Sequence, residues 1–439
     1  MPAEIVPVVG VVGWRCVVCG VTVDIAEAMV FRCPNSTAAD PYHTLQIVQH
    51  DEPVHRISDD SNPFLAYQPY FAWDSFAATL GMSHAERRAL VVEMDTKIAA
   101  IAGTGFVTTP FARADALSDV LGFTAAGGVW VKDETHQVAG SHKARHLFST
   151  LLHLLVAERF GCTPWGDRIG ERRTLAIASC GNAALAASTL AATVEWPIQV
   201  FVPPSANPAV LARLGELGAT ITMCPRRLHD LPGDPCVLRY REAVATGAIP
   251  FSVQGTENAW CLDGGRSIGW EMAAEPLDRV FVQVGGGAFS RCLIGGLAQA
   301  VGGTGNVLPK LHAVQTQSCA PLARAWRRAL DGPGGLATAG ARWRDCMTPW
   351  ETEGHSAADG ILDDETYDWL GIVNGMAASG GSPVVSSESD VLLANQLATT
   401  HTSVDASYTG TAGLAGLLTY RCEVRDHERV AVIFSGNRR

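Results

Sequence analysis

Strand-like and helix-like segments alternate along most of this 439-residue chain, and that alternation restricts the possible fold more than any other feature. Between residues 128 and 224, short runs rich in Val, Ile and Phe are separated by segments with helical periodicity. A strand that enters a glycine turn at 278–287 and a last strand at 429–437 continue the pattern. Parallel strands need crossover connections, usually helices, and these cover the faces of the sheet. The sequence therefore predicts an α/β protein with covered parallel sheets.

The composition is that of a folded protein with a large core and excludes some partners. Apolar residues make up 47% of the chain and charged residues 18%. The net charge of −11 argues against nucleic-acid binding, because such proteins usually carry a basic face. The N-terminal segment contains Glu4 and lacks the basic region of a signal peptide. The longest uncharged run, 174–194, contains Ser, Asn and Thr and is predicted to be buried in protein rather than in a membrane. The twelve cysteines are mostly scattered, as reduced thiols are, so we expect a cytoplasmic protein.

Lys143 lies in the segment GSHKARH and is one of only four lysines, against 29 arginines. Arginine does not lose its proton in a protein, whereas lysine can, and the neutral amine can attack a carbonyl group. Taken alone, a solvated lysine at the start of a helix is the simpler interpretation. Two loops elsewhere in the chain change that balance.

Both loops join a predicted strand to a predicted helix. The segment SCGN, 179–182, would present backbone N–H groups at a helix N-terminus, where a carboxylate can bind. An ordinary turn capped by Asn182 is the alternative. The segment VGGGA, 284–288, has three consecutive glycines that allow a phosphate to approach the backbone. It is not a dinucleotide-binding fingerprint, because Ser290 stands where the last glycine or alanine would be.

Four segments occur in a characteristic order: KDETHQVAGSHKAR, SCGN, VGGGA and the terminal FSGN. Together they resemble the pyridoxal-phosphate enzymes of fold type II. This group includes the tryptophan synthase β-subunit, threonine synthase and the serine/threonine dehydratases. The similarity extends from Thr108–Phe111 to the C-terminus. It implies two parallel-sheet αβα domains after a zinc-ribbon-like β segment, pyridoxal 5'-phosphate as cofactor and an amino acid as substrate. We also expect a homodimer. The expected division is an N-terminal segment, 1–50, a large cofactor-binding domain, 51–144 with 256–439, and a small domain, 145–255.

The resemblance also implies roles for individual residues. Lys143 would be the catalytic residue and would hold the cofactor as a Schiff base. Ser435 would face the pyridine nitrogen. The phosphate would be bound by Gly285, Gly286, Gly287 and Ala288. The substrate carboxylate would be bound by Ser179, Cys180, Gly181 and Asn182, and Asn182 would also reach the cofactor ring hydroxyl.

The motifs favour one reaction and leave others open. The carboxylate loop and SAADGI, 356–361, resemble the dehydratases, whereas His142 before the lysine resembles tryptophan synthase β. A serine at the ring nitrogen supplies no counter-charge, which favours loss of a β-substituent over transamination. We therefore predict a lyase that releases ammonia and a 2-oxo acid. The alternatives are a β-replacement synthase, a threonine synthase-like enzyme, a non-catalytic cofactor-binding regulator and a zinc-ribbon interaction module.

The region before these motifs contains a possible metal site. Cys16 and Cys19 form a CxxC motif, and Cys33 precedes a proline. Structural zinc needs four ligands, and His43 or Asp40 could supply the fourth. A metal-free β-ribbon is the alternative. This region resembles the N-terminal segment of threonine synthases.

Some polar residues are weaker candidates for the pocket above the substrate. They are more often structural than catalytic, since structural polar residues outnumber functional ones. The segment 346–390, rich in Gly, Ser and Asp, is expected to be a loop that shapes this pocket. The residues concerned are His136, His142, Arg145 and Tyr408.

Overall fold

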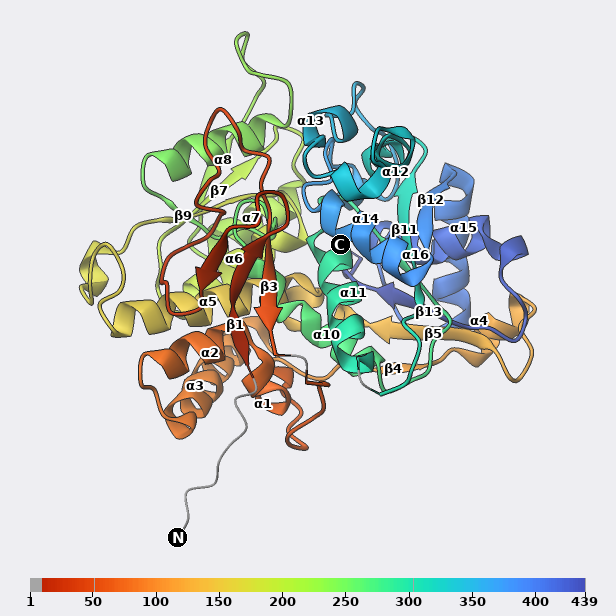
Figure 1. Cartoon of the computed structure of the whole chain (residues 1–439), viewed down its shortest axis with the longest axis horizontal. Coiled ribbons are helices and arrows are strands. Elements are labelled where there is room, and N and C mark those ends of the chain that lie inside the picture. The colour runs from red at the N-terminus through yellow and green to blue at the C-terminus, as the bar shows by residue number, and fades with distance from the viewer. Residues whose placement is uncertain (1–9, 51, 303, 439) are drawn as a thin grey trace.

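A computed structural model describes residues 10–50, 52–302 and 304–438 of the chain (Figure 1). Within these residues the strands form a six-stranded, a four-stranded and a three-stranded sheet. The first nine residues, where the sequence predicts no signal peptide, lie outside the described part. The α/β fold with parallel sheets that the alternation predicts is confirmed.

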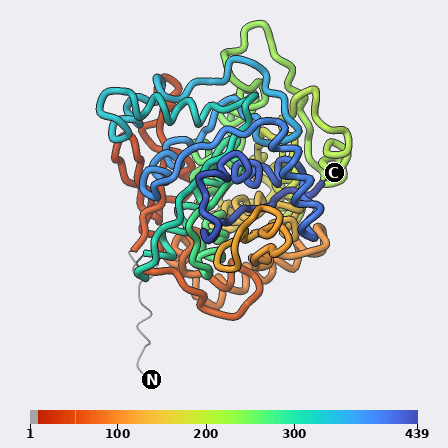
Figure 2. Tube along the Cα trace, turned by 90° about the vertical axis from the view of Figure 1, so that its right-hand side faces the viewer, coloured from red at the N-terminus to blue at the C-terminus, as the bar shows by residue number. Residues whose placement is uncertain are grey.

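The six-stranded sheet has the order β12-β11-β10-β13-β5-β4. Neighbouring strands are parallel except β4 and β5. The C-terminal strand β13 pairs with β5 on one side and β10 on the other, so it joins distant parts of the chain; Figure 2 shows this blue segment beside the orange one. The strands are β4 (Phe111–Arg113), β5 (Gly128–Asp133), β10 (Arg279–Gln283), β11 (Lys310–Thr316), β12 (Ser382–Ser386) and β13 (Arg429–Phe434).

Alternate residues of these strands pack against helices on the two faces of the sheet, as the two-residue period of a strand requires. Val280 and Val282 belong to one apolar cluster, whereas Phe281 between them belongs to another. Helices of the first face are α10 (Arg266–Met272), α11 (Ala288–Val301), α12 (Pro321–Asp331), α13 (Trp343–Cys346) and α14 (Trp369–Ser379). Those of the second are α4 (Asp115–Val120), α15 (Glu388–His401) and α16 (Tyr408–Thr419).

The four-stranded sheet is parallel throughout and has the order β8-β7-β6-β9. The segment 54–106 contributes buried residues to the core of this sheet and packs against it rather than against the six-stranded sheet. The exact division into domains stays a prediction. The strands are β6 (Leu175–Ala178), β7 (Ile198–Val202), β8 (Thr220–Met223) and β9 (Ile249–Pro250). The helices are α1 (Pro63–Ala66), α2 (Ala72–Thr79), α3 (His84–Ala102), α5 (Lys143–Arg159), α6 (Asn182–Thr193), α7 (Pro208–Glu216) and α8 (Pro235–Ala245).

The N-terminal segment forms the small antiparallel sheet that the cysteine-containing region predicts. Its central strand β1 (Val11–Cys16) pairs with β2 (Thr22–Asp24) and β3 (Leu45–Gln49). Trp14 of β1 packs edge-on against Trp260, which precedes the short helix α9 (Cys261–Gly264), with 5.2 Å between ring centroids. The sheet is therefore attached to the main body by buried apolar contacts.

The expectation of a loop over 346–390 is wrong for its second half, whereas residues 347–368 are mostly irregular. The second half contains α14 and β12, and β12 is the edge strand of the large sheet. Its glycines permit close helix packing: a Cβ atom at Gly371 would lie 2.6 Å from Arg291 Cδ, and one at Gly375 would lie 2.8 Å from Ile294 Cγ2. Glycine is unfavourable in an isolated helix, so local sequence suggests a loop, whereas packing against α11 requires a residue without a side chain.

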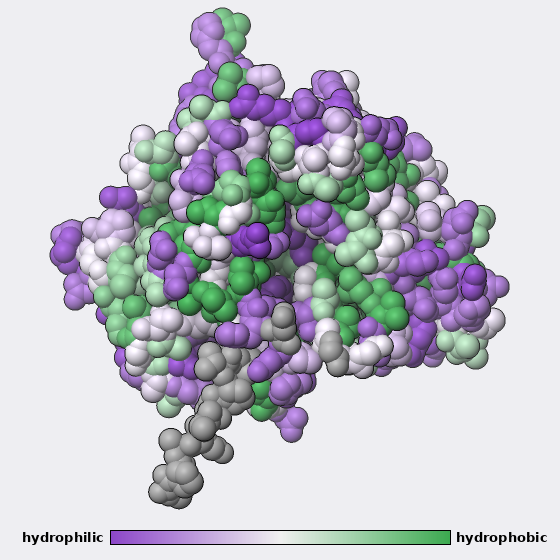
Figure 3. Space-filling view, in the orientation of Figure 1, coloured by the Kyte–Doolittle hydropathy of each residue, from purple (hydrophilic) through white to green (hydrophobic). Residues whose placement is uncertain are grey.

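None of the helices in the described residues is long and apolar enough to cross a membrane. Hydrophilic and hydrophobic residues are interspersed over the face shown in Figure 3. The uncharged run at 174–194, long enough for a membrane span, forms the buried strand β6 and helix α6 instead.

Candidate active site

Lys143 is the first residue of α5 and follows a tightly bent connection from β5. Gly140 in this connection has a φ of +73°, and a Cβ atom there would lie 2.7 Å from the amide group of Asn437. The backbone N–H of Asn437 also donates to the carbonyl oxygen of Gly140 at 3.2 Å. Because β5 and β13 are adjacent parallel strands, their following loops meet at the same edge of the sheet. This pairing brings the lysine loop against the terminal SGN segment.

The environment of Lys143 differs from that of the other three lysines. Burial lowers the pKa of the Lys143 amine, and the Asp363 carboxyl group acts in the opposite direction. Lys132 is fully buried but forms an ion pair with Glu271. The exposed Lys97 pairs with a glutamate one turn away on α3, and the exposed Lys310 begins β11. Lys143 is half-buried. An amine with a lowered pKa is more often neutral, and the neutral form can act as a nucleophile.

Ser435 is buried and contacts His142, the residue before the lysine. The backbone N–H of His142 donates to Ser435 Oγ at 3.1 Å, and His142 Nδ1 lies 2.5 Å from the same oxygen. The imidazole ring stacks on Phe289 with 3.9 Å between ring centroids. Burial, and then the charge of Lys143, hold the pKa of His142 well below its usual value. The ring is therefore neutral at physiological pH.

The glycine loop lies between β10 and the N-terminus of α11. Gly287 has a φ of +99°, which favours glycine, and a Cβ atom there would lie 2.7 Å from Ile372 Cδ1. The N-terminal turn of a helix has unpaired backbone N–H groups and a positive dipole end. Within the described residues, the buried hydroxyl group of Ser290 in this turn has no hydrogen-bond partner. The loop and turn are thus suited to an anion such as phosphate.

Asp363 was not singled out in the sequence and lies against this loop. A Cβ atom at Gly285 would lie 2.1 Å from Asp363 Oδ2. Burial raises the pKa of Asp363 to about 7, whereas the charge of Lys143 and the backbone N–H of Gly286 lower it. Asp363 therefore lies directly beside the glycine loop. The proximity of Asp363 to the SAADGI motif in sequence was the signal that could have identified it.

The SCGN loop joins β6 to α6 and meets the terminal segment from the other side. A Cβ atom at Gly436 would lie 2.6 Å from Asn182 Nδ2, so glycine is needed for this approach. The backbone N–H of Gly181 donates to Ser179 Oγ at 3.4 Å, which holds the turn. Cys180 is exposed, but partial desolvation of its thiol raises the pKa, and the charge of Asp359 raises it further. The lysine, carboxylate and terminal loops are therefore neighbours, although they come from two sheets.

Residues 104–436, more than half of the chain, match the model of the family described as pyridoxal-phosphate dependent enzyme. The chain belongs to this family. The match includes the lysine, carboxylate, glycine and terminal loops and begins after the cysteine-containing sheet.

Enzymes whose solved structures share this fold have names that indicate different reactions. The processed form of threonine deaminase isoform 2 from Solanum lycopersicum has a TM-score of 0.59 at 15% identity, over 82% of this chain and 91% of that one. Maize serine racemase has a TM-score of 0.56 at 17% identity, over 79% and 92%. O-ureido-L-serine synthase has a TM-score of 0.53 at 16% identity, over 78% and 91%. Curated protein sequences contained no match to this chain. At these identities the structures support the fold and not one reaction.

The residues of this family member suit its cofactor. A half-buried amine of lowered pKa is present for the aldehyde, and a glycine loop before a helix N-terminus is present for the phosphate. The buried Ser290 hydroxyl without a partner is a further donor beside that loop. The donor types therefore match the groups that pyridoxal phosphate carries.

Of the weaker pocket candidates, Arg145 is structural. Its guanidinium group is fully buried, donating to Glu134 Oε2 at 2.9 Å and to Glu271 Oε1 at 2.5 Å. His136 is exposed and lies 3.3 Å from an aspartate oxygen of β5. Tyr408 begins α16 and is 38% exposed. His142 contacts a predicted cofactor residue, since its Nδ1 atom lies beside Ser435 Oγ.

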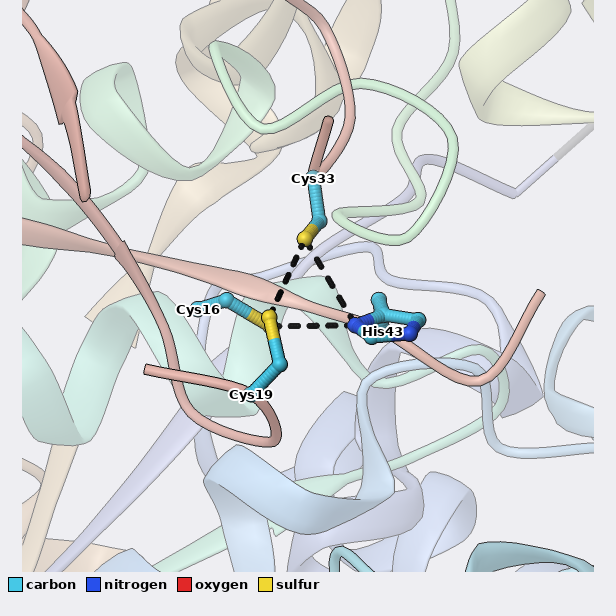
Figure 4. Close-up of side chains that lie close together, drawn as sticks. All are labelled: Cys16, Cys19, Cys33 and His43. Carbon is cyan, nitrogen blue, oxygen red and sulfur yellow. Dashed lines mark hydrogen bonds between the residues drawn. The ribbon is translucent and has the colours of Figure 1, made fainter. Parts of the chain in front are cut away.

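The predicted metal ligands lie together in the N-terminal sheet rather than near Lys143. Figure 4 shows Cys16, Cys19 and Cys33 with His43, and their ligand atoms are all within 4.8 Å of one another. Asp40, the other candidate for a fourth ligand, lies outside this group, with its Oδ2 atom 3.5 Å from His43 Nε2.

Proposed function

We propose that this protein is a lyase that removes the β-substituent of an amino acid and releases ammonia and a 2-oxo acid. The observation that carries the proposal is the pairing of Ser435 with neutral His142, the residue before the half-buried Lys143. Among the described residues, Ser435 Oγ hydrogen-bonds to His142 and to no carboxylate. Each residue is assigned a role from its position and chemistry.

When bound, pyridoxal phosphate supplies an aldehyde that captures amines and a ring that withdraws charge from the substrate Cα. Lys143 Nζ would hold the cofactor through its aldehyde, and, once displaced by the substrate amine, would be the base for the Cα proton. The lowered pKa of this amine leaves a larger neutral fraction near pH 7. Proximity contributes much of the rate advantage, since base and Cα are held together. The backbone N–H groups of Gly285, Gly286, Gly287 and Ala288 bind the phosphate.

The carboxylate loop orients the substrate. Backbone N–H groups of the SCGN turn lie at the N-terminus of α6, where the helix dipole favours an anion. We assign Ser179, Cys180 and Gly181 to the substrate carboxylate. We assign Asn182 to both the carboxylate and the ring hydroxyl of the cofactor, because its amide lies beside the terminal loop. Fixing the carboxylate places the Cα proton toward the lysine.

The proton of the Ser435 hydroxyl group governs the charge on the pyridine nitrogen. A neutral imidazole that carries its proton on Nδ1 donates to Ser435 Oγ, as the His142 backbone N–H does. The serine proton is then available for the pyridine nitrogen. A hydroxyl group is too weak an acid to protonate that nitrogen, so withdrawal of charge from Cα is weak. Rapid departure of a β-substituent is favoured over transamination.

A panel of β-substituted amino acids tests the reaction class. We expect serine, threonine or β-chloroalanine to yield one ammonia for each 2-oxo acid, and 2,3-diaminopropionate, whose β-substituent is itself an amine, to yield two. Both products are measured for the wild type and for Lys143→Ala, with and without an added thiol. Incorporation of the thiol at Cβ with only traces of ammonia would replace the lyase by the β-replacement synthase. Formation of a β-hydroxy amino acid from a γ-phosphorylated substrate would favour a threonine synthase-like enzyme.

Replacing Ser435 with aspartate is expected to add side reactions. A carboxylate next to the pyridine nitrogen raises the pKa of that nitrogen by about 1–3 units. The protonated ring stabilises charge on Cα for longer, so racemisation and half-transamination should increase about tenfold or more. Chiral chromatography and the absorbance of the aminated cofactor measure these products. The neutral Ser435→Asn variant is the control; if it shows the same increase, charge on the nitrogen is not the cause.

A further inference from the structure

Three thiols and one imidazole converge at the end of the N-terminal sheet (Figure 4). Cys16 Sγ and Cys33 Sγ each lie 3.5 Å from His43 Nδ1. Cys19 Sγ lies 3.6 Å from Cys33 Sγ. In a tetrahedral site with ordinary zinc–sulfur and zinc–nitrogen bonds, neighbouring ligand atoms are roughly 3.5–3.8 Å apart. These contacts thus have the spacing of the edges of a zinc tetrahedron.

Strand pairing explains why these four residues meet. Cys16 ends β1 and is paired with Leu45 of β3, which follows His43 by two residues. The turn after Cys16 contains Gly20 with a φ of +76°, and the Gly20 N–H donates to the Cys16 carbonyl oxygen at 3.0 Å. This turn directs Cys19 back toward Cys16. The histidine, 27 residues from Cys16, is brought in by the antiparallel sheet.

Two polar side chains next to the four possible ligands would support a bound metal. Asp40 Oδ2 lies 3.5 Å from His43 Nε2, the nitrogen that does not face the thiols. A carboxylate at that position orients a metal-bound histidine and increases its basicity. The side-chain amide of Asn35 donates to Cys19 Sγ at 3.5 Å, which stabilises a thiolate. We propose that Cys16, Cys19, Cys33 and His43 bind one structural zinc ion. Four protein ligands leave no open position for catalysis.

The proposed zinc site is connected to the glycine loop by hydrogen bonds. Arg291 of α11 donates to Thr44 Oγ1 at 2.6 Å and to the carbonyl oxygen of Leu45, the two residues after His43. The same guanidinium group pairs with Asp368 Oδ1 at 2.8 Å. The backbone N–H of Asp368 donates to the Gly286 carbonyl oxygen at 2.9 Å. Zinc therefore positions the glycine loop through Arg291. This role of zinc rests on the proposed role of the glycine loop in binding the cofactor phosphate.

Metal analysis of the full-length holoenzyme tests the site without any activity assay. We expect about one zinc per chain in protein purified without added metal, and much less in Cys19→Ser. Asp40→Asn should keep the fold and weaken zinc affinity about 10–100-fold. Cys422→Ser, which removes an exposed cysteine outside the cluster, is the control and should keep its zinc. Cobalt exchanged into the wild type should give the visible absorption of a tetrahedral thiolate site. Absence of both zinc and this cobalt spectrum would overturn the site, even if Cys19→Ser fails to fold.

Cofactor affinity tests the connection to the glycine loop separately. Removing zinc from the wild type with a chelator, or using Asp40→Asn at low zinc, should weaken pyridoxal phosphate binding about 2–30-fold. Adding zinc should restore the affinity of both proteins, as followed by cofactor absorbance. An unchanged affinity in zinc-free folded protein would overturn the positioning role and leave the metal site intact. Loss of lyase activity with normal zinc content would count against the proposed function and not against this site.

Discussion

Lys143→Ala is expected to lose the borohydride-fixable adduct with pyridoxal phosphate completely. Borohydride reduces the linkage between a lysine amine and the cofactor aldehyde to a stable amine, which mass spectrometry locates in a peptide. Burial lowers the pKa of the Lys143 amine. This lysine lies at the edge of the sheet where the lysine loop and the terminal loop meet. Alanine removes the nucleophile without disturbing the helix, since alanine has the highest helix propensity.

The other lysines provide the control for this experiment. Lys97→Ala removes an exposed amine that pairs with Glu93 on the surface of α3, so the adduct should be unchanged. Lys132 is held in the buried network of Glu271 and Arg145, and its replacement would test stability rather than chemistry. An adduct that persists in Lys143→Ala at Lys97, Lys132 or Lys310 would contradict the assignment.

Gly286→Asp is expected to weaken pyridoxal phosphate binding by roughly 30- to 1000-fold. A Cβ atom at Gly286 would lie 3.2 Å from Tyr367 Cδ2 and 3.8 Å from Asp363 Oδ1, so the new side chain has little room. The added carboxylate would lie near the phosphate and near Asp363. Repulsion between charges about 4 Å apart costs about 2–4 kcal/mol at an intermediate effective dielectric. Such a cost corresponds to the stated loss of affinity.

The matched control for this variant lies on the same helix. Gly295 of α11 is exposed, and a Cβ atom there has open space around it. Gly295→Asp introduces the same charge two turns away from the loop and should leave cofactor affinity nearly unchanged. Absorbance titration of both apoproteins measures the difference. Equal affinity in Gly286→Asp and the wild type would remove the glycine loop from the cofactor site.

Much of the fold follows from local sequence because strands and helices have short-range signatures. The run RVAVIF predicts a buried strand, and the structure has β13 over the same residues. The pattern does not say that β13 lies between β5 and β10, because partners far apart in the chain are chosen by packing of the whole sheet. The loop expected over 346–390 is wrong from Trp369 on for a related reason, since the glycines of α14 serve contacts with α11 that local sequence does not record.

The sequence alone predicted the family, through one lysine, a carboxylate turn and a glycine loop in an order that resembles one group of enzymes, and the family match confirms that prediction. The roles of these residues stay predictions. Only the tertiary structure decided which side chains meet. It placed His43 rather than Asp40 beside the cysteines, buried Arg145 in ion pairs, and brought Asp363 to the glycine loop. The physical reason is the separation in sequence between the residues that interact. Turn and helix-terminus chemistry depends on a few adjacent residues, whereas contacts between side chains depend on strand pairing across hundreds of residues.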